Sequence, residues 1–157
     1  MNNNIIITIL YGLPGSGKST YAKLNSHNHV IIDWDIIYFK SKSNLLMNLC
    51  KDINIILYDK SITNIIIDGL FTTNNQVKML IDYLNINLKY NILYNLVWWE
   101  EDRETCLFND KGRRAISSAI SIKRLPFELP DLKILKKLNV NNIMKKKVVK
   151  KSAVQAW

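Results

Sequence analysis

The sequence contains few cysteines, and none lies in a pattern that is typical of a disulfide framework or a zinc site. Cys50 and Cys106 are far apart, no C-x-x-C motif occurs, and no histidine lies near either one. We therefore expect a reducing, cytoplasmic setting. No apolar run approaches the ~20 residues of a membrane-spanning helix, and the apolar run at residues 5–11 is too short for a signal peptide. The predicted protein has no membrane partner.

Acidic residues are absent after Asp131, which concentrates the positive charge in the segment 132–157. The net charge of the 157 residues is +9, and this segment contains eight lysines. They are Lys133, Lys136, Lys137, Lys145, Lys146, Lys147, Lys150 and Lys151. Such a segment attracts polyanions, nucleic acid above all. The alternative is a solvated tail that contributes to solubility.

The chain also lacks internal repeats and Pro- or Ser-rich linkers, so a single domain over residues 1–157 is the simplest prediction. Its apolar runs and helical patterns alternate along the sequence, which favours an α/β fold with a parallel sheet and helices on both faces. We predict strands at residues 5–11, 30–33, 63–68 and 90–99, with a possible last strand at 138–144. We predict helices at residues 18–25, at 34–59 in one or two pieces, and at 74–88, 100–108 and 117–125.

A glycine-rich motif joins the first predicted strand to the first helix and matches G-x-x-x-x-G-K-[ST]. Its glycines allow backbone N–H groups to turn towards a phosphate, and the helix N-terminus adds a positive dipole. Lys18 is expected to reach the β- and γ-phosphates, and Ser19 to bind Mg²⁺. The predicted fold is therefore of the P-loop NTPase type. The predicted nucleotide-binding residues are Gly12, Leu13, Pro14, Gly15, Ser16, Gly17, Lys18, Ser19 and Thr20.

Carboxylates follow the second and third predicted strands, at the edge of the sheet where ligands bind in open α/β folds. Asp35 is our preferred base for an attacking hydroxyl, with Asp33 as the alternative. One of the two is expected to cap the following helix instead. Asp68 ends the run Ile-Ile-Ile-Asp, a Walker B pattern that predicts a second Mg²⁺ ligand.

A basic loop lies between the two helices predicted after the fourth strand. Residues 110–114 read Asp-Lys-Gly-Arg-Arg. Phosphoryl transfer spreads negative charge over the transferred group, and arginines on a mobile loop can stabilise it. We predict a short lid here with Arg113 and Arg114 as catalytic charge-stabilising residues; the alternative is a basic surface turn.

The layout from Ile5 to Arg114 resembles the kinase domain of bacteriophage-type polynucleotide 5′-kinases. The resemblance implies ATP and Mg²⁺ as cofactors, Lys18 and Ser19 as phosphate and metal ligands, and Asp35 as the base. It also implies a lid cation near Lys111 or Arg113. Tyr38 stands where that family usually has an arginine for the acceptor.

Three functions remain open at this point. The first is an ATP-dependent kinase acting on a 5′-hydroxyl of RNA or DNA, with the lysine-rich segment holding the polyanion. The second is a kinase for a nucleoside, nucleotide or sugar. The third is a nucleotide-binding module with little or no kinase activity. The oligomeric state is not predicted by the sequence.

Overall fold

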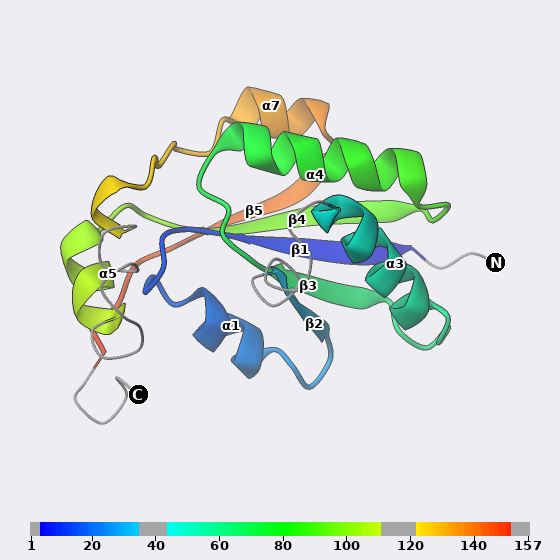
Figure 1. Ribbon diagram of the computed structural model, residues 1–157, viewed down its shortest axis with the longest axis horizontal. Helices are drawn as coiled ribbons and strands as arrows, with labels where there is room; N and C mark the ends of the chain where they lie inside the picture. The colour runs from blue at the N-terminus through cyan, green and yellow to red at the C-terminus, as the bar shows by residue number, and fades with distance from the viewer. Residues whose placement is uncertain (1–3, 35–43, 111–121, 152–157) are drawn as a thin grey trace.

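A five-stranded parallel sheet forms the centre of the computed structural model, which describes residues 4–34, 44–110 and 122–151 (Figure 1). The strand order is β2-β3-β1-β4-β5. The strands are β1 (Ile5–Tyr11), β2 (Val30–Asp33), β3 (Asn64–Asp68), β4 (Ile92–Trp99) and β5 (Val140–Lys146). Because all four ladders are parallel, the strands end at the same edge of the sheet.

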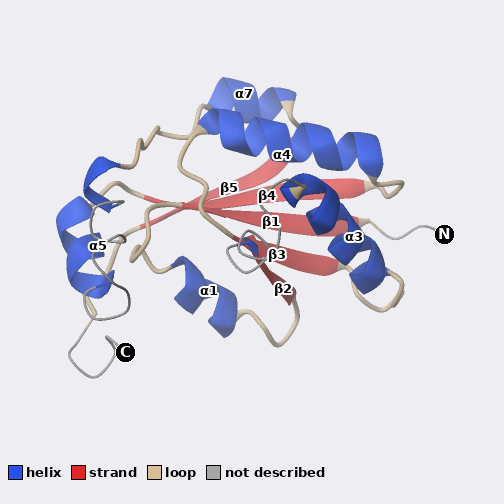
Figure 2. Ribbon diagram, in the orientation of Figure 1, coloured by secondary structure: helices blue, strands red, loops and turns tan. Residues whose placement is uncertain are grey.

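Helices cover both faces of this sheet (Figure 2). On one face lie α3 (Leu45–Leu57), α4 (Asn74–Asn87) and α7 (Leu132–Lys137), and on the other lies α1 (Lys18–Leu24). A fifth helix, α5 (Arg103–Asp110), lies beyond the carboxyl ends of the strands (Figure 1). The α/β fold predicted from the alternating pattern is thus confirmed.

The alternation of side chains along β1 divides the core between the two faces. Ile7 and Ile9 belong to the larger cluster with residues of α3 and α4, whereas Leu10 packs with Ala22 of α1. Nearly every residue of β1 is buried, as expected for the central strand of a parallel sheet.

Helices α4 and α7 each begin with a side-chain cap. Thr73 accepts a hydrogen bond from the Gln76 backbone, and the Gln76 side chain accepts one from the Thr73 backbone, so α4 begins with a capping box. Asp131 caps α7 through the backbone N–H groups of Lys133 and Ile134. The caps fix where each of these two helices begins.

The described part of the lysine-rich segment contains regular secondary structure, and most of the side chains of its strand are exposed. Residues 132–137 form α7, and residues 140–146 form β5, which pairs with β4. Leu135 is buried, and this apolar contact accounts for the docking of the segment against the sheet. The last strand begins and ends two residues later than predicted.

Other boundaries also moved by a few residues. Helix α5 starts at Arg103 and continues to Asp110, so Asn109 and Asp110 belong to a helix rather than to the predicted loop. Their burial explains the difference, because two polar side chains anchored in the protein hold the last turn in place. The helix predicted within residues 34–59 is α3, and residues 35–43 lie outside the described part. Cys50 and Cys106 are free and buried.

In the described ranges no helix combines the length and apolar character needed to cross a membrane.

Replacing Ile7 by alanine tests the role of β1. Ile7 is fully buried in the main core, so we expect a loss of about 2–5 kcal/mol in the free energy of unfolding. The control is Ile86→Ala on α4, where the side chain is 81% exposed and the expected change is below about 0.5 kcal/mol. Equal effects in denaturant titrations would contradict the assigned core.

Candidate functional site

The glycine-rich loop lies at the carboxyl edge of the sheet, between β1 and α1. Strand β1 has β3 on one side and β4 on the other, although β2 and β3 follow it in the sequence. The loop is therefore at the point where the strand order reverses, which is where open α/β sheets form a ligand crevice.

Glycine is required at the turn of this loop. Gly15 and Gly17 have positive φ angles of 80° and 116°. A Cβ atom on Gly15 would also lie 2.3 Å from the Cys106 carbonyl oxygen, which is backbone of α5 and cannot rotate away. The loop thus needs glycine both for its conformation and for the close approach of α5.

Two polar side chains of the loop are directed into it. The ammonium of Lys18 donates hydrogen bonds to the carbonyl oxygens of Gly12 and Leu13, at 2.7 and 2.8 Å. The hydroxyl of Ser16 is buried and has no hydrogen-bond partner among the described residues. A buried hydroxyl without a partner is costly, so this atom fits a loop that receives a ligand oxygen.

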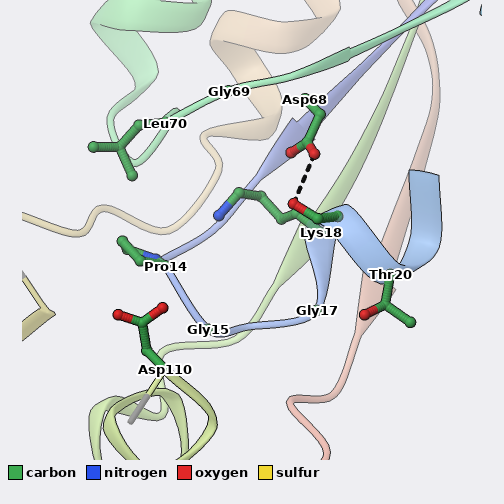
Figure 3. Close-up of a pocket in the computed structure, with 10 residues that line it drawn as sticks. Pro14, Gly15, Gly17, Lys18, Thr20, Asp68, Gly69, Leu70 and Asp110 are labelled. Atoms are coloured by element: carbon green, nitrogen blue, oxygen red, sulfur yellow. Dashed lines mark hydrogen bonds between the residues drawn. The ribbon is translucent and has the colours of Figure 1, made fainter. Parts of the chain in front are cut away.

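Ser19 meets the end of β3 at the first turn of α1. Its hydroxyl donates a hydrogen bond to a carboxylate oxygen of Asp68 at 2.8 Å (Figure 3). The register Leu10↔Asp68 places this carboxylate beside the end of β1, where the loop begins. The two predicted metal ligands are therefore adjacent.

A cavity of about 80 Å³ lies between the loop and these groups. Its lining consists of Pro14, Gly15, Gly17, Lys18, Ser19, Thr20, Asp68, Gly69, Leu70 and Asp110. In Figure 3 the Asp110 side chain extends from α5 towards Pro14, on the side of the loop opposite Asp68. The cavity is polar and small, and its size suits a phosphate group rather than a whole nucleotide.

The donor set fits Mg²⁺ and a nucleotide phosphate. Mg²⁺ prefers oxygen ligands and is usually held by one or two protein groups together with waters and phosphates. Ser19 and Asp68 supply such oxygens, although the described residues contain no group of three or more His, Cys, Asp or Glu side chains suited to a metal. Backbone N–H groups of the loop and Lys18 supply the positive field for the phosphate.

Cys106 packs under the loop and is fully buried. Burial raises the pKa of its thiol to about 11, and the neighbouring carboxylates Asp102 and Asp110 add to the rise, while Lys18 and Arg103 oppose it. The thiol is therefore protonated at neutral pH and acts as a small apolar side chain. Its backbone carbonyl provides the contact with Gly15 described above.

Several predicted site residues lie outside the described ranges. These are Asp35, Tyr38, Lys111, Arg113 and Arg114, so the base and the lid remain predictions. Asp33 ends β2 in register with Asp68, and its side chain is exposed. Residues opposite each other in a parallel ladder share a face of the sheet. Asp33 therefore lies on the α1 side of the sheet, together with Asp68.

Two buried residues of the site were not found from the sequence. Asn109 donates hydrogen bonds to the carbonyl oxygens of Gly15, at 3.0 Å, and Val149, at 2.8 Å. Asp110 lines the cavity. A position next to a basic loop is typical of exposed residues, and the partners of Asn109 lie far away in the sequence, so no local pattern predicts this arrangement.

Arg103, the first residue of α5, has a structural role in the described part. Its guanidinium donates hydrogen bonds to the carbonyl oxygens of Ile122 and Leu125, each at 2.8 Å. These contacts tie the start of α5 to residues beyond the predicted lid.

Comparison with solved structures identifies the fold. A gluconokinase from Sinorhizobium meliloti 1021 has a TM-score of 0.56 at 10% identity, with 95% of this chain and 86% of that chain covered. A fungal RNA kinase has a TM-score of 0.57 at 12% identity, with 99% and 82% covered. The chain has the fold of P-loop kinases.

A third similar structure comes from the PezAT toxin–antitoxin system of Streptococcus pneumoniae. Its TM-score is 0.53 at 16% identity, and the match covers 98% of this chain and 72% of that chain. No family model matches the sequence, and no curated protein matches it. At these identities the likeness concerns the P-loop kinase fold, and the substrate has to be argued from the site.

Replacing Gly15 by alanine is expected to deform the loop. The positive φ and the clash with the Cys106 carbonyl impose strain of about 1–3 kcal/mol. Nucleotide binding should then weaken roughly tenfold to hundredfold in equilibrium titrations. The exposed His27→Ala in the turn after α1 is the control. Wild-type affinity in the folded Gly15→Ala protein would refute the required backbone conformation.

Proposed function

We propose that the protein is an ATP-dependent phosphotransferase that transfers the γ-phosphate of ATP to a hydroxyl group. The observation that carries the proposal is the contact between Ser19 and Asp68 at 2.8 Å, directly beside the loop that contains Lys18. A phosphate-binding loop alone would hold an anion. A hydroxyl and a carboxylate next to it add the oxygen ligands that a metal–nucleotide complex requires.

In this proposal Ser19 and Asp68 would hold Mg²⁺, directly or through water, which would supply positive charge next to the phosphates. Lys18 lines the cavity, and hydrogen bonds to the carbonyl oxygens of Gly12 and Leu13 hold its ammonium at the loop. The buried hydroxyl of Ser16 would gain a phosphate oxygen as its partner. Catalysis of this kind consists largely of positioning and electrostatic stabilisation.

The proposed base is Asp35, with Asp33 as the alternative, and Arg113 and Arg114 are the proposed lid cations. Support for a base near this position comes from β2, whose last residue is in register with Asp68. Asp33 itself lies at the carboxyl edge of the sheet, next to the strand whose last residue, Asp68, faces the start of the phosphate loop. The base must lie within hydrogen-bond reach of the acceptor hydroxyl.

The proposed acceptor is a 5′-hydroxyl of RNA or DNA. Support comes from the sheet edge formed by β5 and the residues after it, where Lys145, Lys147 and Lys150 are exposed. The ammonium of Lys145 lies 5.4 Å from the ring centre of Trp98, and that of Lys150 lies 4.3 Å from the ring centre of Phe108. Cations combined with aromatic rings are typical of surfaces that bind single-stranded nucleic acid.

A second candidate is a small-metabolite kinase, and a groove between α3 and α4 favours it. The groove has a volume of about 460 Å³ and shares Leu70 with the phosphate cavity. Trp34, Phe71 and Tyr83 are among its lining residues, and none of the described lining residues is charged. An apolar, aromatic groove suits a ring-containing small acceptor better than a polyanion.

A panel of acceptors separates the candidates. Labelled ATP and Mg²⁺ are supplied together with 5′-hydroxyl RNA and DNA oligonucleotides, nucleosides, nucleotides and sugars. Transfer to oligonucleotides that is lost in Lys18→Ala is the expected result. Transfer to small acceptors alone would replace the proposed acceptor by the second candidate. Binding of ATP without transfer to any acceptor would instead identify a nucleotide-binding module.

Two further substitutions test the proposed metal ligands. Ser19→Ala and Asp68→Asn each remove one oxygen of the pair, so Mg²⁺-dependent nucleotide affinity should fall by at least about tenfold. Affinity measured with EDTA should change little, because the phosphate loop is left intact. Ser26→Ala, which removes an exposed hydroxyl after α1, is the control. Equal losses with and without Mg²⁺ would contradict the metal assignment.

A further inference from the structure

The side chain of Asn109 links two segments that are remote in the sequence. Its amide nitrogen donates to the carbonyl oxygens of Gly15 and Val149, and its amide oxygen accepts a hydrogen bond from the backbone N–H of Lys151 at 2.8 Å. The side chain is 1% exposed. Both amide hydrogens and one lone pair are thus used on backbone groups, which fixes the orientation of the amide.

One of these contacts sets the direction of a peptide group in the phosphate loop. The Gly15 carbonyl is held by Asn109 from outside the loop, and the N–H of Ser16, in the same peptide group, donates to the Leu13 carbonyl at 3.2 Å. In a trans peptide the C=O and N–H point in opposite directions. Holding the carbonyl outward therefore directs the N–H to the inside of the loop.

Helix α5 reinforces this arrangement at a second point. The Cys106 carbonyl occupies the space that a Cβ on Gly15 would fill, so α5 contacts the loop backbone one turn before Asn109. The loop is thereby supported by main-chain contact at Cys106 and by a directed hydrogen bond at Asn109.

The segment after β5 is held on the other side of Asn109. Val148 packs against two of the hydrophobic clusters, one that contains Ala22 of α1 and one that contains Leu13 and Cys106. The ammonium of Lys150 lies over the ring of Phe108 on α5. The packing of Val148 and the ring contact of Lys150 place the neighbouring residues, Val149 and Lys151, against Asn109.

We infer that Asn109 is a positioning residue for the phosphate loop, and that residues 149–151 are a structural part of the nucleotide site. The inference rests on the proposed function in one respect, because the loop must bind a nucleotide phosphate. The hydrogen bonds of the Asn109 side chain all go to backbone groups, so Asn109 would act through the loop rather than by contact with a ligand. It transmits the position of the C-terminal segment to the peptide group between Gly15 and Ser16.

The test uses ADP as the probe and the full-length chain. Asn109→Ala removes all three hydrogen bonds of the side chain, and Lys151→Pro removes the single N–H that donates to it. Lys151→Ala is the matched control, because it removes the charge and keeps the N–H. The dissociation constant of ADP is measured with Mg²⁺ and with EDTA for each protein.

We expect Asn109→Ala and Lys151→Pro to weaken ADP binding by about tenfold or more under both conditions. Lys151→Ala should bind ADP within about twofold of the wild-type protein, because it keeps the backbone N–H. If the charge of Lys151 were responsible, this variant would bind as weakly as Lys151→Pro. The double variant Asn109→Ala/Lys151→Pro should bind no more weakly than Asn109→Ala, since both changes break the same link. Wild-type affinity in folded Lys151→Pro, or additive losses in the double variant, would overturn the inference.

Amide hydrogen exchange of residues 12–17 without nucleotide separates the inference from the proposed function. The loop should exchange faster in Asn109→Ala and Lys151→Pro than in the wild-type protein and Lys151→Ala. If the wild-type protein binds no ADP, the proposed function fails while faster exchange still supports the link. Unchanged exchange in both variants overturns it whatever the affinity.

Discussion

The ladder between β1 and β3 is the interaction on which the site depends. It aligns Leu10 with Asp68, so the residue that ends β3 reaches the edge where the glycine-rich loop begins. Both strands are buried on their two faces, and the apolar side chains leave little freedom in register. A shift by one residue would turn Asp68 to the opposite face of the sheet, away from Ser19 on α1. The geometry of the site is thus a consequence of core packing.

Much of this could be predicted from the sequence, because the relevant patterns are local. The run Ile5–Tyr11, the glycines and Lys18 are contiguous, and each part has a direct physical reason. Asp68 could be placed at the end of a buried strand, because it directly follows a run of three isoleucines. Alternating apolar runs then gave the α/β class, which does not require knowledge of any long-range contact.

The parts that could not be predicted depend on distant contacts. Asn109 appears in the sequence as one polar residue before a basic loop, yet its partners are Gly15, Val149 and Lys151. The packing of the lysine-rich segment was not predicted, because its charge dominates the pattern and the burial of Leu135 depends on distant residues of the core. Charge density predicts solvent exposure of side chains, whereas β5 still pairs its backbone with β4.

The hydrogen bonds of Asn109 also have a consequence for folding during synthesis, because they join segments that are made at different times. The phosphate loop is synthesised before β2 to β4, and α5 follows β4, while Val149 and Lys151 leave the ribosome later than α5. A nascent chain that has completed β1 to β4 can form most of the sheet. The Asn109 side chain then still lacks two of its three hydrogen bonds, those with Val149 and Lys151. If those contacts hold the loop, nucleotide competence is gained only after residues 149–151 have been synthesised, and a chain terminated before them would fold around a loop that is not fully formed.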